Sequence, residues 1–220
     1  MQIHIWSDVV CPWCYVGKRR FERALEDFAH RDHVQVTHRS FQLDPERSRA
    51  ETSSRRRMLM SKYRRSAAEV LEMDAKMEAL AAAEGLEYHL TDANLTGNTL
   101  DAHQLLHLAR PHGLQDAMLE RLYRAYFTEL RSLFDRESLV ALGGEVGLDT
   151  SEARQALEDG RFADAVATDL NDAKRLGVTG VPFFVVDGRY GISGAQQTEV
   201  FSQILARAWA ERAQGMPEEG

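Results

Sequence analysis

Apolar positions at the start of the chain follow two different periods. Ile3 and Ile5 alternate with polar residues and lead into Val9–Val10, which is typical of a buried strand that ends in a turn. Residues 12–29 instead carry apolar side chains at helical spacing, and alternation returns over residues 33–43. We therefore expect a strand, a helix and a second strand parallel to the first, joined by a right-handed crossover.

The pattern is almost only helical from about residue 52 to residue 162. Ser66 with Glu69, and Asp149 with Glu152, have the spacing of a capping box, and Gly85 is a signal for the end of a helix. Within this region the pattern predicts helices over residues 98–110, 115–130, 136–146 and 151–158. This stretch is expected to form a helical subdomain inserted between two halves of an α/β unit.

An α/β pattern returns near the end of the chain. A helix ended by Gly177 precedes two short strands in "VPFFVVDGRYGIS", which Asp187–Gly188 joins as a hairpin turn. A terminal helix follows over residues 195–213. The expected division is therefore an α/β domain made of residues 1–50 and 160–214, an inserted subdomain of residues 51–159, and a frayed tail of residues 215–220.

The composition and charge of the chain argue against some classes of protein. The 220 residues are 44 % hydrophobic, enough for a sizeable core, and the formal net charge of −7 argues against general nucleic-acid binding. No apolar run has the length of a membrane span, and "MQIHIWSDVV" lacks the features of a secretory signal. We expect a cytoplasmic protein that binds neither nucleic acid nor membrane, as a monomer or a homodimer.

Both cysteines of the chain, Cys11 and Cys14, lie where the first strand meets the helix. At the helix N-terminus, free backbone N–H groups and the helix dipole would stabilise a Cys11 thiolate, the nucleophile of disulfide exchange. Cys14 lies nearly one turn further on, on the same side and more buried, where it can attack a mixed disulfide. Pro12 is expected to fix the helix start, and Trp13 to shape the rim beside the Cys11 sulfur.

Three other interpretations of the pair remain open. The cysteines could form a structural disulfide, or they could be ordinary buried side chains. They could also be half of a zinc site completed by His4 and His38, although no second Cys-x-x-Cys and no His-x-x-x-His accompanies them. We expect no metal.

The segment "GVTGVPFF" gives a second signal. If the Val181–Pro182 bond is cis, the backbone N–H and C=O of Val181 point outward and can pair with an extended substrate strand. The alternative is a trans proline that begins an edge strand. The Cys-Pro-Trp-Cys motif upstream favours the cis form.

Three stretches together resemble the DsbA-like branch of the thioredoxin superfamily, and specifically FrnE-type proteins: "SDVVCPWCYVGKRRFE", "GNTLDAHQLLHLA" and "RLGVTGVPFFVVDGRYGISGAQ". The resemblance covers nearly the whole chain. It implies a thioredoxin-like α/β fold with a central mixed sheet, a large inserted all-helical subdomain, and thiol–disulfide oxidoreductase or isomerase activity. It also implies Cys11 as the nucleophile, Cys14 as the resolving thiol and Pro182 as the cis-proline.

Relatives in the same branch leave other activities open. They include kappa-class glutathione transferases and 2-hydroxychromene-2-carboxylate isomerases, which commonly carry a serine where this chain has Cys11. The alternatives are therefore a glutathione-dependent transferase or isomerase of that kind, and a peptide-binding holdase. Expected partners are protein or small-molecule thiols and disulfides. Glutathione is open as a co-substrate, and no other cofactor is expected.

Further polar residues are candidates for the site. Asn98 and His103 are expected to line a cleft facing Cys11 and to bind substrate, and His103 could instead tune the Cys11 thiolate. The alternative is a helix cap and a helix surface. A metal site at His103 and His107 has only weak support. Asp8 is a candidate acceptor for the Cys14 proton or a group that holds the active-site loop, the alternative being a turn or cap carboxylate.

Residues 47–65 hold seven arginines and one lysine against a single Glu51. Such a run could steer acidic peptides or a carboxylate of glutathione, but a solvated helix face is the commoner case. An apolar wall is expected from Met58, Leu59, Met60 and Tyr63.

Overall fold

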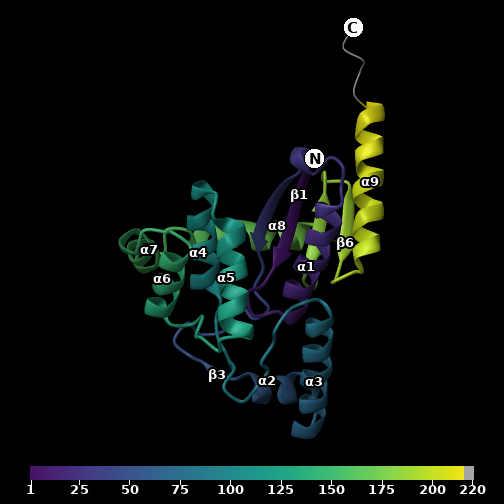
Figure 1. Cartoon of the computed structure of the whole chain (residues 1–220). Coiled ribbons are helices and arrows are strands. Elements are labelled where there is room, and N and C mark those ends of the chain that lie inside the picture. Colours follow the sequence, from purple (N-terminus) through teal and green to yellow (C-terminus); the bar gives the residue numbers. More distant parts are fainter. Residues whose placement is uncertain (216–220) are drawn as a thin grey trace.

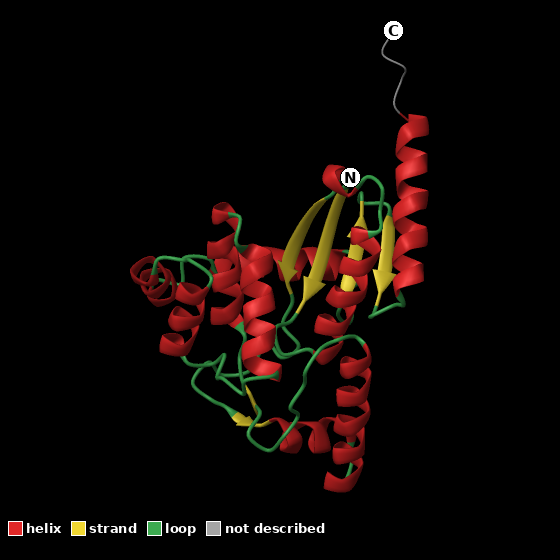
Figure 2. Cartoon of the chain, in the orientation of Figure 1, coloured by secondary structure: helices red, strands yellow, loops and turns green. Residues whose placement is uncertain are grey.

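The computed structural model describes residues 1–215, with side chains up to residue 212, so most of the expected tail of residues 215–220 lies outside the described residues. A four-stranded sheet has the order β2-β1-β5-β6. Its strands are β1 (Gln2–Ser7), β2 (Gln35–Ser40), β5 (Phe183–Val186) and β6 (Tyr190–Ser193). The β1–β2 pair is parallel, as predicted, whereas β5 runs antiparallel to β1 and β6 antiparallel to β5, which makes the sheet mixed (Figure 2).

Helices cover both faces of this sheet (Figure 1). On one face, α1 (Pro12–Glu26) and α9 (Thr198–Gly215) pack on Ile3 and Ile5 of β1. On the other face, α8 (Ala163–Arg175) packs on Trp6. Because neighbouring residues of a strand point to opposite faces, Ile3 and Ile5 face α1 and α9 while Trp6 faces α8, so β1 is buried on both sides.

The region between β2 and α8 forms the helical insertion. It contains α2 (Arg55–Tyr63), α3 (Ala67–Ala83), α4 (Leu100–Ala109), α5 (Gln115–Phe127), α6 (Arg136–Glu145) and α7 (Thr150–Glu158). Ser66 and Asp149 cap α3 and α7 as predicted, and Ser66 makes the full capping box with Glu69. Short 3₁₀ turns occur at Arg31–His33 and Arg110–His112.

One element of the insertion was not predicted. Strands β3 (Ser53–Ser54) and β4 (Leu95–Thr96) form a separate two-stranded ladder. Two residues are too few to show a strand period, so the sequence pattern could not indicate them. Apart from this ladder, the insertion is helical, and the predicted fold class is confirmed.

The insertion packs directly on the helix that carries the cysteines. Cys14 and Tyr15 of α1 belong to the same apolar core as Leu105, Tyr123 and Phe127 of the insertion. The Tyr15 ring stacks on that of Tyr123, with centroids 4.7 Å apart. The division of the chain at residues 51 and 159 remains a prediction, since this core runs across it.

None of the helices within residues 1–215 combines the length and the apolar character that crossing a membrane requires.

Candidate active site

The two cysteines lie at the junction of β1 and α1. Cys11 is the N-cap residue of α1 and has extended backbone angles, while Pro12 is in the first helical turn, as predicted. Both cysteines are free thiols. Their exposed fractions are 5 % for Cys11 and 1 % for Cys14, so Cys14 is the more buried of the two, as expected.

The loop before β5 faces Cys11. The Val181–Pro182 peptide bond is cis, and the Cys11 thiol donates a hydrogen bond to the Val181 carbonyl oxygen, with a sulfur–oxygen distance of 3.7 Å. Helix α1 also comes very close to this loop, because a Cβ atom on Gly17 would lie only 2.8 Å from Cγ of Pro182. Segments about 170 residues apart in the chain are therefore brought together around one sulfur.

Cys14 is held in its neutral form. Burial is the largest cause, and the neighbouring Cys11 sulfur adds to it, so that the pKa of the Cys14 thiol lies well above its ordinary value. A neutral Cys14 cannot compete with Cys11 as the first nucleophile, because the thiolate is the reactive form. The two thiols therefore have different surroundings although only two residues separate them.

The prediction that His103 lines the cleft and contacts substrate is wrong. His103 is completely buried, and its Nε2 lies 3.2 Å from Oδ1 of Asp8. The other carboxylate oxygen of Asp8 accepts a hydrogen bond of 2.8 Å from the Leu43 N–H. Both Asp8 oxygens are thus engaged, and the carboxylate joins the active-site loop to α4 and to the loop after β2. The sequence could not reveal this pairing because 95 residues separate its partners.

Asn98 does not line the large cavity beside Cys11, although its neighbours Gly97 and Thr99 do. Its Oδ1 accepts from the Leu100 N–H and from the Gln42 side chain, and its Nδ2 donates to the Arg47 carbonyl oxygen. Helix α4 starts at Leu100, two residues later than predicted, with Thr99 as the N-cap residue. The Asn98 side chain therefore ties the helix start to the loop after β2, and its role in substrate binding stays a prediction.

A tyrosine that the sequence did not single out supports the motif. The Tyr88 hydroxyl donates a 2.8 Å hydrogen bond to the carbonyl oxygen of Pro12. Its ring stacks on Phe127, with centroids 4.5 Å apart. Burial is the main reason that the pKa of Tyr88 is raised far above its ordinary value, so this hydroxyl remains a donor. An isolated tyrosine outside any periodic pattern gives no sequence signal for such a contact.

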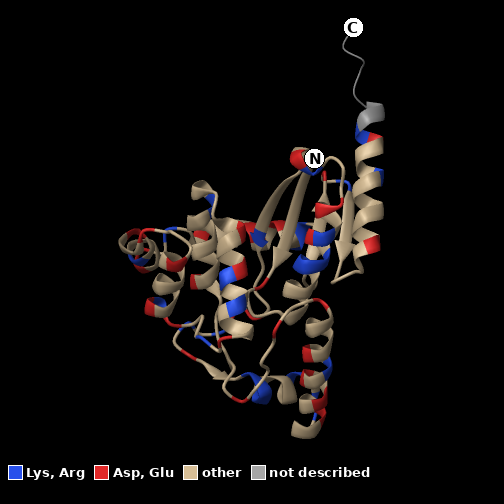
Figure 3. Cartoon of the chain, viewed as in Figure 1, with Lys and Arg blue, Asp and Glu red and all other residues tan. Residues whose placement is uncertain are grey.

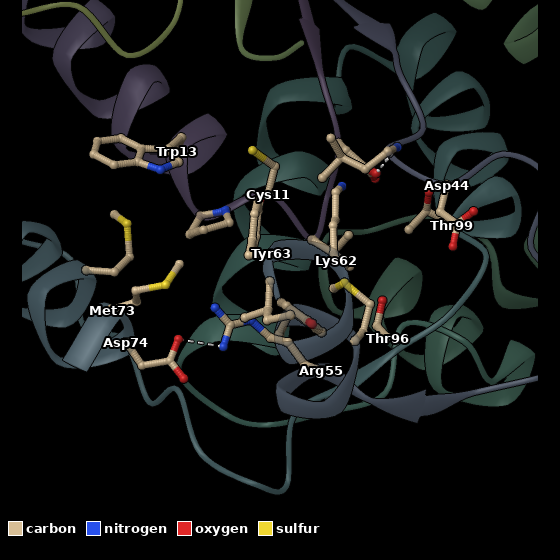
Figure 4. A pocket seen from close by; sticks show the side chains of 18 of the residues that line it. Cys11, Trp13, Asp44, Arg55, Lys62, Tyr63, Met73, Asp74, Thr96 and Thr99 are labelled. Carbon is tan, nitrogen blue, oxygen red and sulfur yellow. Dashed lines mark hydrogen bonds and ion pairs between the residues drawn. The ribbon is translucent and has the colours of Figure 1, made fainter. Parts of the chain in front are cut away.

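A cavity of about 1090 Å³ opens beside Cys11 (Figure 4). One wall comes from the cysteine motif and the proline loop, and the opposite wall from α2 and α3 of the insertion. Apolar side chains of these two walls, together with Leu43 after β2 and Tyr126 of α5, line it: Val10, Trp13, Met58, Leu59, Tyr63, Met73, Met77, Leu80 and Val181. Met58, Leu59 and Tyr63 thus form the predicted wall, whereas Met60 is outside the lining.

The Arg-rich segment lies along this cavity. Arg47, Arg55, Arg57 and Lys62 all line it, and α2 carries a visible cluster of basic residues (Figure 3). Arg55 is buried and forms an ion pair of 2.8 Å with Asp74 (Figure 4). Half of the basic residues of this segment therefore border the candidate site, whereas the sequence favoured a solvated helix face.

The two histidines considered for a metal site, His103 and His107, each contact a carboxylate. Within the described part of the chain, no group of three or more His, Cys, Asp or Glu side chains is placed to hold a metal ion. His107 instead contacts Asp169 and Ser40, at 3.1 and 3.2 Å.

Comparison with known proteins agrees with this geometry. The model of the DSBA-like thioredoxin domain family matches residues 2–206. The chain belongs to this family. A probable DsbA oxidoreductase from Streptomyces coelicolor is 48 % identical, with a TM-score of 0.93 over 100 % of this chain and 93 % of that protein.

Two more distant structures share the fold alone. A 2-hydroxychromene-2-carboxylate isomerase has a TM-score of 0.72 at 15 % identity, over 99 % of this chain and all of that one. The cytosolic disulfide reductase DsbM from Pseudomonas aeruginosa, solved with GSH, has a TM-score of 0.64 at 18 % identity, over 97 % of this chain and 98 % of its own.

Proposed function

We propose that this DsbA-like protein exchanges thiols and disulfides with protein or small-molecule substrates through Cys11. From the dithiol form, the Cys11 thiolate attacks one sulfur of a substrate disulfide, and the other substrate sulfur leaves as a thiolate. Cys14 then loses its proton and attacks the Cys11 sulfur, which releases the second substrate thiolate. The two thiol protons end on the substrate, which gains two electrons, while Cys11 and Cys14 become a disulfide. The reverse sequence oxidises a dithiol.

The observation that carries this proposal is the arrangement around the Cys11 sulfur. The sulfur lies at the N-terminus of α1, 3.7 Å from the Val181 carbonyl oxygen, and beside a large cavity. The backbone at Val181, which lines the cavity, can pair with an extended substrate and hold its sulfur in line with Cys11. Because burial keeps Cys14 neutral, Cys11 is left to make the first attack.

The roles of the two cysteines can be separated by substitution. We expect Cys11→Ser to abolish insulin reduction and the isomerisation of scrambled substrates, because the first attack needs the Cys11 thiolate. Cys14→Ser should instead accumulate mixed disulfides between Cys11 and substrate, visible by non-reducing electrophoresis and mass spectrometry. Full turnover by Cys11→Ser would rule out the proposal.

The direction of electron flow follows from the redox potential. A potential of the Cys11–Cys14 pair well above that of the glutathione pool would indicate an oxidase or isomerase, and a potential near the cytosolic value a reductase. Titration against glutathione buffers measures it. We place the reaction in the cytoplasm, a proposal supported by the likeness to a cytosolic reductase.

A glutathione-dependent transferase or isomerase is the second candidate, supported by the likeness to 2-hydroxychromene-2-carboxylate isomerase. Conjugation of glutathione without any protein-disulfide exchange would favour it. A peptide-binding holdase would suppress aggregation equally well with both cysteines replaced. The first assay compares the wild type with Cys11→Ser, and the aggregation assay compares the wild type with the double variant Cys11→Ser/Cys14→Ser.

A further inference from the structure

The cavity beside Cys11 exposes large apolar side chains to solvent. Trp13, Leu43, Tyr63 and Met73 line it and are 46, 40, 50 and 40 % exposed. They are half of the large apolar side chains that are exposed in the described part of the chain. Apolar groups concentrated at one place in this way are typical of a surface that binds a partner.

Each carboxylate that lines the cavity already has a partner. Asp44 pairs with Arg47 at 3.2 Å, and Asp74 pairs with Arg55 at 2.8 Å. The remaining carboxylate, Asp8, is buried against a histidine and a backbone N–H. None of the three is therefore available to attract a cationic ligand.

Three basic side chains that line the cavity have no carboxylate partner among the described residues. Arg57 and Lys62 on α2 and Lys76 on α3 line it, are exposed, and form no ion pair with any residue of the described chain. Lys62 lies 6.0 Å from the centre of the Tyr63 ring, next to the apolar wall. A surplus of positive charge on a protein with a net charge of −7 raises the local concentration of anionic partners.

The cavity has room for a polypeptide segment. Its volume of about 1090 Å³ lies at the upper end of the range of roughly 300–1,000 Å³ that is typical of ligand pockets. The Val181 edge at its rim suits an extended main chain. A peptide can supply an apolar side chain for Trp13 and Tyr63, and carboxylates for the lysines, on either side of its reactive sulfur.

We infer that the substrates are polypeptide segments whose reactive cysteine is flanked by acidic residues and a large apolar side chain, and that Arg57, Lys62 and Lys76 select them. This inference rests on the proposed function. The chemical step is the exchange described above, and it needs no further reactant in a single turnover.

The test uses the pre-reduced protein and three peptides that differ only in charge. Each peptide carries a disulfide and a neighbouring Phe, flanked by Glu, Gln or Lys residues, and stopped-flow fluorescence gives the second-order rate constant. At low ionic strength we expect the Glu peptide to react about tenfold faster than the Lys peptide, with Gln between them. Salt should reduce this difference, because it screens exposed charges.

Charge reversal identifies the residues responsible. The double variant Lys62→Glu/Lys76→Glu should invert the preference. The matched control Lys174→Glu/Arg189→Glu changes the net charge equally at exposed residues outside the cavity, and it should retain the preference. Equal rates for all three peptides with the wild type, or an unchanged preference in the first variant, would overturn the inference.

The outcomes separate this inference from the proposed function. If the exchange rate does not depend on peptide charge but exchange is lost in Cys11→Ser, only the inference is contradicted. Turnover by Cys11→Ser would contradict the proposed function. A glutathione disulfide that reacts faster than every peptide, with the same dependence on Lys62 and Lys76, would identify a small-molecule partner and overturn the peptide assignment.

Discussion

At the scale of single residues, the candidate site depends on unequal surroundings for chemically similar groups. Cys11 opens to the cavity and contacts the Val181 carbonyl oxygen, whereas Cys14 points into the core. Burial raises the pKa of Cys14. The same cysteine type can therefore begin the exchange at one position and complete it at the other.

Asp8 is expected to act by positioning. Asp8→Ala would leave the buried His103 ring and the Leu43 N–H without their partner, and we expect the free energy of unfolding to fall by about 3 kcal/mol. Chemical denaturation measures this loss. The exposed Asp27, next to the end of α1, provides the control, since Asp27→Ala should change stability little. A wild-type-like denaturation midpoint for Asp8→Ala would contradict the role.

At the scale of elements, the site depends on how closely α1 approaches the loop before β5. Gly17 is the residue of α1 that faces Pro182, and it has no Cβ to hold the two segments apart. Cys11 precedes the same helix and Val181 precedes the proline. The position of the sulfur relative to the Val181 backbone is therefore set by helix–loop packing.

Gly17→Ala tests this packing. Alanine favours the helix by about 1 kcal/mol, but the new Cβ would lie 2.8 Å from Pro182, and overpacking costs about 1–3 kcal/mol. We expect a net loss of about 1 kcal/mol and slower exchange, measured by thermal denaturation and by the peptide assay. Gly180→Ala is the control for stability, because its Cβ would meet no atom within 4 Å. Gly17→Ala with unchanged stability and rate would show that the loop can shift freely.

At the scale of the whole molecule, carboxylates hold the insertion to the rest of the fold. Glu84, at the end of α3, accepts hydrogen bonds of 2.6 Å from Arg20 and 2.5 Å from Arg23 of α1. Asp169 of α8 contacts His107 of α4 at 3.1 Å and accepts from the Ser40 N–H of β2 at 2.8 Å. These contacts join elements that are distant in the sequence.

These carboxylates predict a loss of stability in acid. Burial opposes ionisation of Glu84, but hydrogen bonds from Arg20 and Arg23 outweigh it and hold its pKa below the usual value. A lowered pKa in the folded state gives stability that is complete above the unfolded value of about 4.3 and is lost as the pH falls through the lower folded value. The pKa of Asp169 is lowered in the same direction, because hydrogen bonds from His107, Ser40 and Arg39 outweigh its burial.

Glu84→Gln isolates one of these contributions. At neutral pH we expect it to destabilise the protein by about 3 kcal/mol, because it leaves two arginines beside a neutral side chain in a largely buried site. Its stability should then fall less than that of the wild type when the pH drops below about 4.3. Urea denaturation as a function of pH measures both effects. Glu137→Gln, at an exposed pair with Arg154, is the control and should alter neither. Parallel pH curves for wild type and Glu84→Gln would contradict this account.

The sequence by itself determined the local structure and the chemistry-bearing residues. Periodicity and caps depend on residues within a few positions of one another, so the parallel β1–β2 unit, the starts of α3 and α7 and the cysteines at the start of α1 were all predictable. The resemblance to DsbA-like proteins supplied the fold class. Strands β3 and β4 pair over only two residues each, and this length is too short to give a strand pattern in the sequence.

Only the tertiary structure decided which polar residues reach the cavity. His103 lies in the core against Asp8, the Asn98 side chain bonds to the Arg47 carbonyl oxygen, and the Tyr88 hydroxyl bonds to the Pro12 carbonyl oxygen. Each of these contacts joins residues more than 50 positions apart in the sequence. The sequence did not distinguish a solvated face of α2 from one that binds a partner, whereas the structure places α2 along the cavity. The physical reason is that burial and pairing depend on the surroundings that distant segments provide, whereas a sequence pattern reports only on neighbours along the chain.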